Sequence, residues 1–216
     1  SSILAKHNCN IVESKQFTDQ ENGHFFIRQS FTLSNINVLN KLEDDLLILS
    51  NHLNAEFFLS DIQSSMNTIM LVSKFDHCLN DILYRVRNNS LNLNIKAIVS
   101  NHKIAEEIAN FSKIPFYYFP VDKSNKEKQE LKIKNLIIKN DVEMIVLARY
   151  MQVLSKEFTN EFQGKIINIH HSFLPSFKGA RAYHQAHNRG VKIIGATTHY
   201  VTPDLDEGPI IDQDIE

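Results

Sequence analysis

The feature that most constrains the fold is a regular alternation of apolar and amphipathic segments between residues 68 and 200. Thr68–Val72, Ile95–Val99 and Val142–Ala148 are short apolar runs, typical of strands buried on both faces of a sheet. The segments between them have apolar residues three and four positions apart, which predicts helices, for example over 79–86. This alternation predicts an α/β fold with a doubly wound, mostly parallel sheet and helices on both faces.

Capping residues, glycine and proline indicate where the other elements of this pattern begin and end. The elements expected are a helix over 104–111, a strand over 115–119, a helix from a Ser124–Glu127 capping box to about residue 139, a short helix capped by Ser155, a strand at Ile166–Ile167, a helix over 180–189 and a strand over 191–200.

The first 62 residues have a different pattern of apolar and polar residues, which predicts a small α+β unit. Its expected elements are the end of a helix over 1–7, strands over 10–17 and 24–33, a helix over 39–53 and a closing strand over 55–59. Asn22-Gly23 favours a tight hairpin turn between the first two strands. Because the segment 60–67 is polar and typical of a linker, the expected domains are residues 1–62 and 63–216.

Composition excludes several classes of protein. The formal net charge is −2, so nothing favours a nucleic-acid partner. No apolar run reaches the roughly 20 residues that cross a bilayer, so no membrane partner is expected. Cys9 and Cys78 form neither a disulfide framework nor a Cys-x-x-Cys pair, and a cytoplasmic location is the simplest expectation.

The residues best suited to chemistry lie near the end of the chain. Asn168 and His170 are two apart on an expected strand end, so their side chains point the same way while Ile169 turns into the core. Asp206 follows a strand that ends near Tyr200, and we expect all three groups at the rim where strands end. An amide, an imidazole and a carboxylate can polarise a carbonyl, hold its oxyanion and manage a proton.

The residues alone leave plainer interpretations open. An isolated Asn-x-His is more often a turn residue beside a core histidine, and a loop aspartate more often stabilises a turn. Asp204 and Glu207 also compete with Asp206 for the role of the carboxylate.

Other chemistries have weaker support. His184 and His187 could present two ligands to zinc, but no completing carboxylate or thiol accompanies them, so no metal is expected. Ser172 lacks the Gly-x-Ser-x-Gly elbow of a nucleophilic serine. The segment Val72–Leu79, where a phosphate-binding loop would lie, contains no glycine.

Four sequence strings resemble the formyltetrahydrofolate deformylase family, and the resemblance covers nearly the whole chain. The strings are Lys-Phe-Asp-His-Cys-Leu (74–79), Leu-Ala-Arg-Tyr-Met-Gln (147–152), Asn-Ile-His-His-Ser-Phe-Leu-Pro (168–175) and His-Tyr-Val-Thr-Pro-Asp-Leu-Asp-Glu-Gly-Pro-Ile-Ile (199–211). The resemblance implies a ferredoxin-like ACT domain over 1–62, incomplete at its N-terminus. It implies a Rossmann-like formyltransferase domain with a mostly parallel sheet over 63–216, incomplete at its C-terminus.

The resemblance also implies an enzyme that hydrolyses 10-formyltetrahydrofolate to tetrahydrofolate and formate, for one-carbon and purine metabolism, without a cofactor. In the implied catalytic set Asn168 and His170 hold the oxyanion, and Asp206 positions the attacking water and His170. The implied folate-binding residues form two segments: Arg149, Tyr150, Met151, Gln152, Val153 and Leu154, then Val201, Thr202 and Leu205. A homodimer or homotetramer and an amino-acid effector at the ACT domain are further implied partners.

Two other functions compete with this interpretation. A glycinamide ribonucleotide formyltransferase shares the formyl-donor chemistry, but it needs a glycine-containing loop where this chain has Lys74 to Leu79. A non-catalytic module that senses a folate or an amino acid would bind without turnover, and an intact set of Asn168, His170 and Asp206 argues against it.

Overall fold

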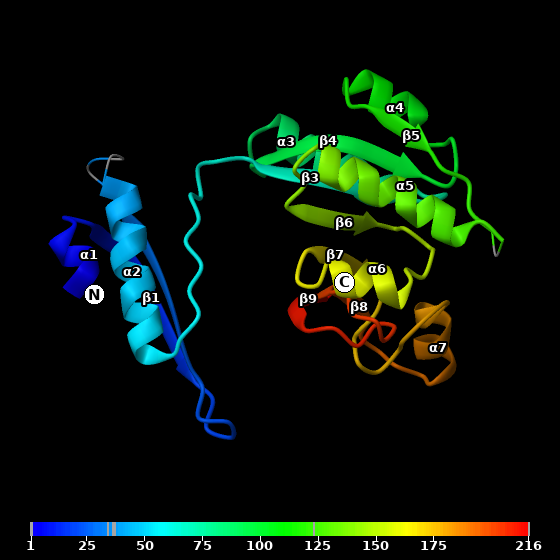
Figure 1. The fold of residues 1–216 in the computed structure, drawn as a ribbon. Helices are drawn as coiled ribbons and strands as arrows, with labels where there is room; N and C mark the ends of the chain where they lie inside the picture. Colours follow the sequence, from blue (N-terminus) through cyan, green and yellow to red (C-terminus); the bar gives the residue numbers. More distant parts are fainter. Residues whose placement is uncertain (1, 34, 36–37, 123, 216) are drawn as a thin grey trace. The chain divides into compact units, whose positions relative to one another are not determined.

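The computed structural model describes residues 2–33, 35, 38–122 and 124–215, and the chain divides into two compact units, Ser1–Asp61 and Ile62–Glu216 (Figure 1). The elements of the first unit are α1 (Ser2–Lys6), β1 (Asn10–Thr18), β2 (Phe25–Thr32) and α2 (Leu39–Leu53). The elements of the second unit are β3 (Met66–Val72), α3 (His77–Arg87), β4 (Leu93–Ser100), α4 (Glu106–Phe111), β5 (Phe116–Tyr118), α5 (Lys126–Lys139), β6 (Met144–Ala148), α6 (Lys156–Glu161), β7 (Ile166–His170), α7 (Ala182–Asn188), β8 (Gly195–Tyr200) and β9 (Ile210–Ile215).

The first unit is an antiparallel hairpin of β1 and β2 accompanied by two helices. Gly23 in the connecting turn has φ 71°, which glycine adopts without the clash that a Cβ would cause. The predicted strands and the helix over 39–53 are confirmed. The predicted strand over 55–59 is wrong: this segment pairs with no described strand, and Phe58 is 93% exposed. Strand propensity forms a strand only where a partner edge is available.

The ACT domain expected over 1–62 is corrected by this result. A ferredoxin-like fold needs a four-stranded sheet, and the described residues of the first unit supply two strands, β1 and β2. The described residues of the unit therefore form one hairpin and two helices, and the amino-acid effector implied at an ACT domain stays a prediction.

The second unit is built on a seven-stranded sheet in the order β5-β4-β3-β6-β7-β8-β9. The pairs from β5 to β7 are parallel, and β8 and β9 are added antiparallel. Alternate residues of β3 enter different cores: Ile69 and Leu71 pack with α5 and α6 residues, and Met70 and Val72 pack with α3 and α4 residues. Helices therefore cover both faces, as the continuous apolar pattern of the strands predicts.

Of the two helix caps predicted in this unit, one is confirmed and the other is wrong. Ser155 caps α6 as expected, because its hydroxyl oxygen accepts a hydrogen bond from the Phe158 N–H at 3.1 Å. The Ser124–Glu127 capping box is wrong. The residue before α5 is Asn125, whose side chain makes no capping bond, and the Ser124 hydroxyl donates to Asp122 instead. In addition, β8 begins at Gly195 rather than at residue 191.

Among residues 2–33, 35, 38–122 and 124–215, no helix combines the length and apolarity needed to cross a membrane.

Gly208, between β8 and β9, gives the first testable prediction. A Cβ at this position would overlap the Tyr200 carbonyl oxygen, and the neighbouring Pro209 carbonyl accepts the Tyr200 N–H at 2.9 Å. We therefore expect Gly208→Ala to lower the free energy of unfolding by at least about 2 kcal/mol in urea titrations. The matched control is Gly190→Ala, where a Cβ meets nothing within 4 Å and only the left-handed backbone is strained. Equal losses in the two variants would contradict the prediction.

Candidate active site

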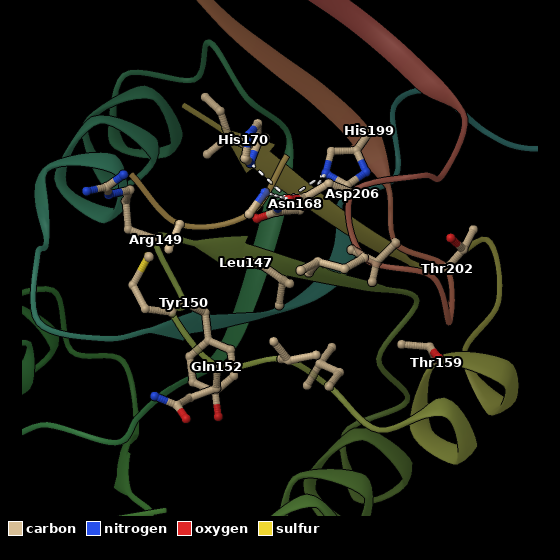
Figure 2. Close-up of a pocket in the computed structure, with 18 of the residues that line it drawn as sticks. Leu147, Arg149, Tyr150, Gln152, Thr159, Asn168, His170, His199, Thr202 and Asp206 are labelled. Carbon is tan, nitrogen blue, oxygen red and sulfur yellow. Dashed lines mark hydrogen bonds and ion pairs between the residues drawn. The ribbon is translucent and has the colours of Figure 1, made fainter. Parts of the chain in front are cut away.

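A pocket in the second unit gathers every residue that the sequence predicted for the site (Figure 2). The segment after β6 contributes Arg149 to Leu154, β7 contributes Asn168 and His170, and the loop after β8 contributes Val201, Thr202, Leu205 and Asp206. Further lining residues that sequence reasoning did not assign are Leu147, Thr159, Ile169, His171, Gly179, Ala180, His199 and Pro203. The lining of the pocket is mainly carbon, and the side chains of Asn168, His170, His199 and Asp206 lie together at one side of it.

Asn168 is held by His199. The two residues face each other across the antiparallel pair of β7 and β8, and the Asn168 Nδ2 donates to the His199 Nε2 at 3.1 Å. The other ring nitrogen, Nδ1, lies 2.9 Å from the Tyr200 carbonyl, which can only accept, so Nδ1 carries the proton. His199 is therefore a neutral acceptor that fixes the orientation of the Asn168 amide and leaves the second amide hydrogen free.

His170 presents one ring nitrogen to the pocket. Its Nε2 donates to the Phe177 carbonyl at 2.7 Å, and its Nδ1 lies 3.4 Å from the Asp206 Oδ2. The residue is 4% exposed. Because Nε2 is occupied by a backbone acceptor, Nδ1 is the nitrogen that can exchange a proton with a bound molecule. The predicted orientation of Ile169 is wrong: this side chain is 38% exposed and does not enter the core.

Asp206 reaches His170 by a route that the sequence did not predict. The expectation that all three residues follow strands ending at one rim is wrong, because β8 runs antiparallel to β7 and Tyr200 lies opposite Ile167. The loop from Val201 to Gly208 folds back, and Asp206 adopts φ 56° within it. The Gly179 N–H donates to Asp206 Oδ2 at 2.8 Å, and Oδ1 lies 3.7 Å from His199 Nε2.

The competing carboxylates lie differently. Glu207 forms an exposed ion pair with Lys178 at 2.7 Å, and neither Glu207 nor Asp204 lines the pocket. The geometry thus brings Asn168, His170 and Asp206 together, with His199 as a fourth member. Cross-strand pairing could have revealed His199, because a histidine two residues before the loop of Asp206 faces Asn168 once the pair is antiparallel.

Within the described residues, no three or more histidine, cysteine, aspartate or glutamate side chains form a cluster of the kind that holds a metal ion.

The burial of His199 predicts a pH dependence of stability. Burial lowers the pKa of His199, although the Tyr200 carbonyl and Asp206 act in the opposite direction. Below the usual pKa of about 6.5 the unfolded chain binds a proton that the folded chain excludes, so this contribution is present above pH 6.5 and lost as the pH falls. We expect His199→Gln to reduce the slope of unfolding free energy against pH between about 6.5 and 5, by at most about 1.4 kcal/mol per pH unit.

The control for this measurement is His184→Gln, on the exposed side of α7. His171 keeps part of the slope in both variants, because burial, followed by Arg149 and His170, also lowers its pKa. A His199→Gln slope equal to that of the wild type would show that His199 is not held neutral.

Comparison with known proteins identifies relatives of the whole chain. Residues 66–215, more than half of the sequence, match the family described as formyl transferase. A formyltetrahydrofolate deformylase of Corynebacterium sp. (strain P-1) is 40% identical over 216 residues, covering 100% of this chain and 76% of the relative.

Similar solved structures include proteins of the same name. The crystal structure of a formyltetrahydrofolate deformylase from Burkholderia mallei has a TM-score of 0.91 and 40% identity, and the match covers 100% of this chain and 76% of that one. A phosphoribosylglycinamide formyltransferase from Anaplasma phagocytophilum matches less of the chain. Its TM-score is 0.64 at 33% identity, with 70% of this chain and 71% of that chain covered.

Proposed function

This chain belongs to the formyltetrahydrofolate deformylase family, and from that premise we propose that it hydrolyses 10-formyltetrahydrofolate to tetrahydrofolate and formate. It is a hydrolase that acts on the bond between the formyl carbon and N10. Water and the folate are the reactants, and no cofactor takes part in the proposed steps. Formate released in this way would enter one-carbon and purine metabolism, and a cytoplasmic location fits the two free cysteines.

The substrate would enter the pocket with its ring against the segment after β6. Met151 and Val153 are 49% and 60% exposed there, and Leu205 on the opposite loop is 52% exposed, so a flat ring could cover all three. Burying such apolar surface would stabilise the complex, and the backbone groups of Gln152 to Leu154 could orient the ring. This arrangement would bring the formyl group towards Asn168.

The formyl oxygen would be held by Asn168 and His170. Water attack turns this oxygen into an oxyanion, and fixed donors aimed at that position lower the barrier. The free amide hydrogen of Asn168 is one donor, held in direction by His199. The Nδ1–H of protonated His170 is the other, because its Nε2 is already engaged by Phe177.

Asp206 would position the attacking water and the His170 ring. Its Oδ2 accepts from the Gly179 N–H and faces His170, so the carboxylate is held in place and can accept a hydrogen bond from water. As water adds to the formyl carbon, one of its protons passes to the Asp206 carboxylate. The bond between the formyl carbon and N10 then breaks, its electron pair stays on N10, and protonated His170 gives N10 a proton. The proton held by Asp206 passes to the neighbouring His170, which restores both groups.

The observation that carries this proposal is the convergence of the Asn168 amide, the His170 Nδ1 and the Asp206 carboxylate in one pocket. The experiment is to incubate the protein with 10-formyltetrahydrofolate and follow formate, with and without glycinamide ribonucleotide. Formate release that needs no second substrate supports the proposal. Formylation of the ribonucleotide without formate would contradict it and favour a formyltransferase.

Self-association is a second part of the proposal. In the described residues β1 and β2 each leave one edge unpaired, and Phe17, Phe25 and Phe26 are more than half exposed. Open edges with apolar side chains favour pairing with another chain. Light scattering that gives the mass of a monomer at micromolar concentration would exclude a homodimer or homotetramer.

A further inference from the structure

The sheet changes its direction of growth between β3 and β6. From β3 the chain adds β4 and β5 on one side, and it then returns to add β6 on the other side. In doubly wound sheets the crevice at the carboxyl ends of such a strand pair is the usual place for a ligand. The segments that leave these two strands here are Ser73–Asp76 and Arg149–Met151.

Arg149 and the half-exposed Phe75 lie in contact at this crevice. The guanidinium carbon of Arg149 lies 5.7 Å from the centroid of the Phe75 ring, within the range of a cation–π contact. The Met151 N–H donates to the Ser73 hydroxyl at 2.9 Å, which ties the two segments together. No described residue between β3 and α3 lines the pocket, so the pocket ends at Arg149. We call this pair the Arg149–Phe75 wall.

The backbone of Arg149 is strained at a position that borders the pocket. Its φ is 62°, a region that glycine adopts freely and that a residue with a Cβ adopts at a cost. Its buried Nε finds no hydrogen-bond partner in the described chain. Strained residues of this kind are held by the surrounding structure and cluster at active sites.

The wall lies directly beside the catalytic group. Ala148 pairs with Val72 and Leu147 pairs with Asn168, so the next residue, Arg149, lies between the end of β3 and the end of β7. The positive charge of Arg149 affects the pKa of two nearby groups. Burial is the main cause that lowers the pKa of His171, and Arg149 is the next. Burial raises the pKa of the Cys78 thiol, and Arg149 acts against that rise. In Figure 2 the Arg149 side chain is turned away from Asn168, towards the edge of the pocket.

We propose that the Arg149–Phe75 wall excludes formyl acceptors larger than water, and so decides between hydrolysis and formyl transfer. This inference rests on the proposed hydrolysis. A primary amine could use the same catalytic groups: its nitrogen lone pair attacks the formyl carbon, the bond to N10 breaks, and N10 takes the proton that the amine loses. The wall would stand in the space such an amine needs, and the Arg149 guanidinium, which forms no ion pair with the described residues, would repel its protonated form.

Three variants open the wall: Phe75→Ala, Arg149→Gly and the double variant. Glycine suits the left-handed backbone at position 149, so this change relieves strain. The matched control is Phe111→Ala on α4, where an exposed phenylalanine lies outside the pocket. Each protein is given 10-formyltetrahydrofolate with glycinamide as acceptor, and mass spectrometry measures formate and N-formylglycinamide together.

We expect the wild type and Phe111→Ala to give formate, and the wall variants to raise the ratio of N-formylglycinamide to formate at least about tenfold. Wild-type ratios in all three wall variants overturn the inference and leave the proposed hydrolysis intact. Loss of both products in Phe75→Ala also overturns it, because Phe75 would then serve catalysis. A wild type that releases no formate without acceptor contradicts the proposed hydrolysis, and the inference with it.

Discussion

Replacing His170 with alanine lowers kcat by about 10²–10⁴-fold, the usual contribution of a group that transfers a proton in the transition state. The Nδ1 of His170 is the only ring nitrogen free to face a substrate, because Nε2 donates to the Phe177 carbonyl. In the proposed complex, the folate is bound mainly by the two segments that line the apolar part of the pocket. We therefore expect the dissociation constant for the folate to change much less than kcat.

The loss of His170 also leaves the buried Phe177 carbonyl without its partner, which costs about 1–3 kcal/mol of stability. Unfolding curves must therefore be measured beside the kinetics, and added imidazole should restore part of the turnover. The control variant is His184→Ala on the exposed side of α7. An equal loss of folate binding and turnover in a folded His170→Ala protein would assign His170 a structural role.

Asp206→Asn is expected to have the second-largest effect, a fall in kcat of at least about 10²-fold. Asparagine tolerates the left-handed backbone at this position and can still accept from the Gly179 N–H, so the loop keeps its shape. Only the negative charge facing His170 and His199 is removed. Steady-state kinetics and thermal unfolding curves of Asp206→Asn and of the control Glu207→Gln check this expectation.

Glu207→Gln is the matched control for Asp206→Asn. Glu207 is the next residue, and its carboxylate pairs with Lys178 at the surface, outside the pocket. Exposed pairs of this kind contribute about 0–1 kcal/mol, so we expect turnover close to that of the wild type. A normal kcat in Asp206→Asn would remove the carboxylate from the mechanism.

Much of the second unit could be predicted because its physical signals are local. Continuous apolar runs such as Val142–Ala148 form strands buried on both faces, and the Ser155 hydroxyl caps a helix through its own neighbours. The spacing of Asn168 and His170 on one strand also places them in the same pocket by the period of two alone.

The failures concern features that depend on distant partners. The direction of β8 cannot be read from its own residues, and the path that returns Asp206 to His170 depends on that direction. The role of His199 depends on its cross-strand neighbour Asn168 for the same reason. The segment 55–59 has strand propensity but no described partner edge. The Ser124 hydroxyl donates a hydrogen bond to the nearby Asp122 carboxylate and therefore does not cap the helix as expected.

The central claim is that water attacks the formyl carbon in the pocket of Asn168, His170 and Asp206, and the most direct test is a single turnover in ¹⁸O-labelled water. With enzyme in excess over 10-formyltetrahydrofolate and no other acceptor present, mass spectrometry follows the oxygen atoms of formate. We predict one labelled oxygen per formate and one tetrahydrofolate per formate released. Unlabelled formate, or tetrahydrofolate formed without formate, would contradict the account.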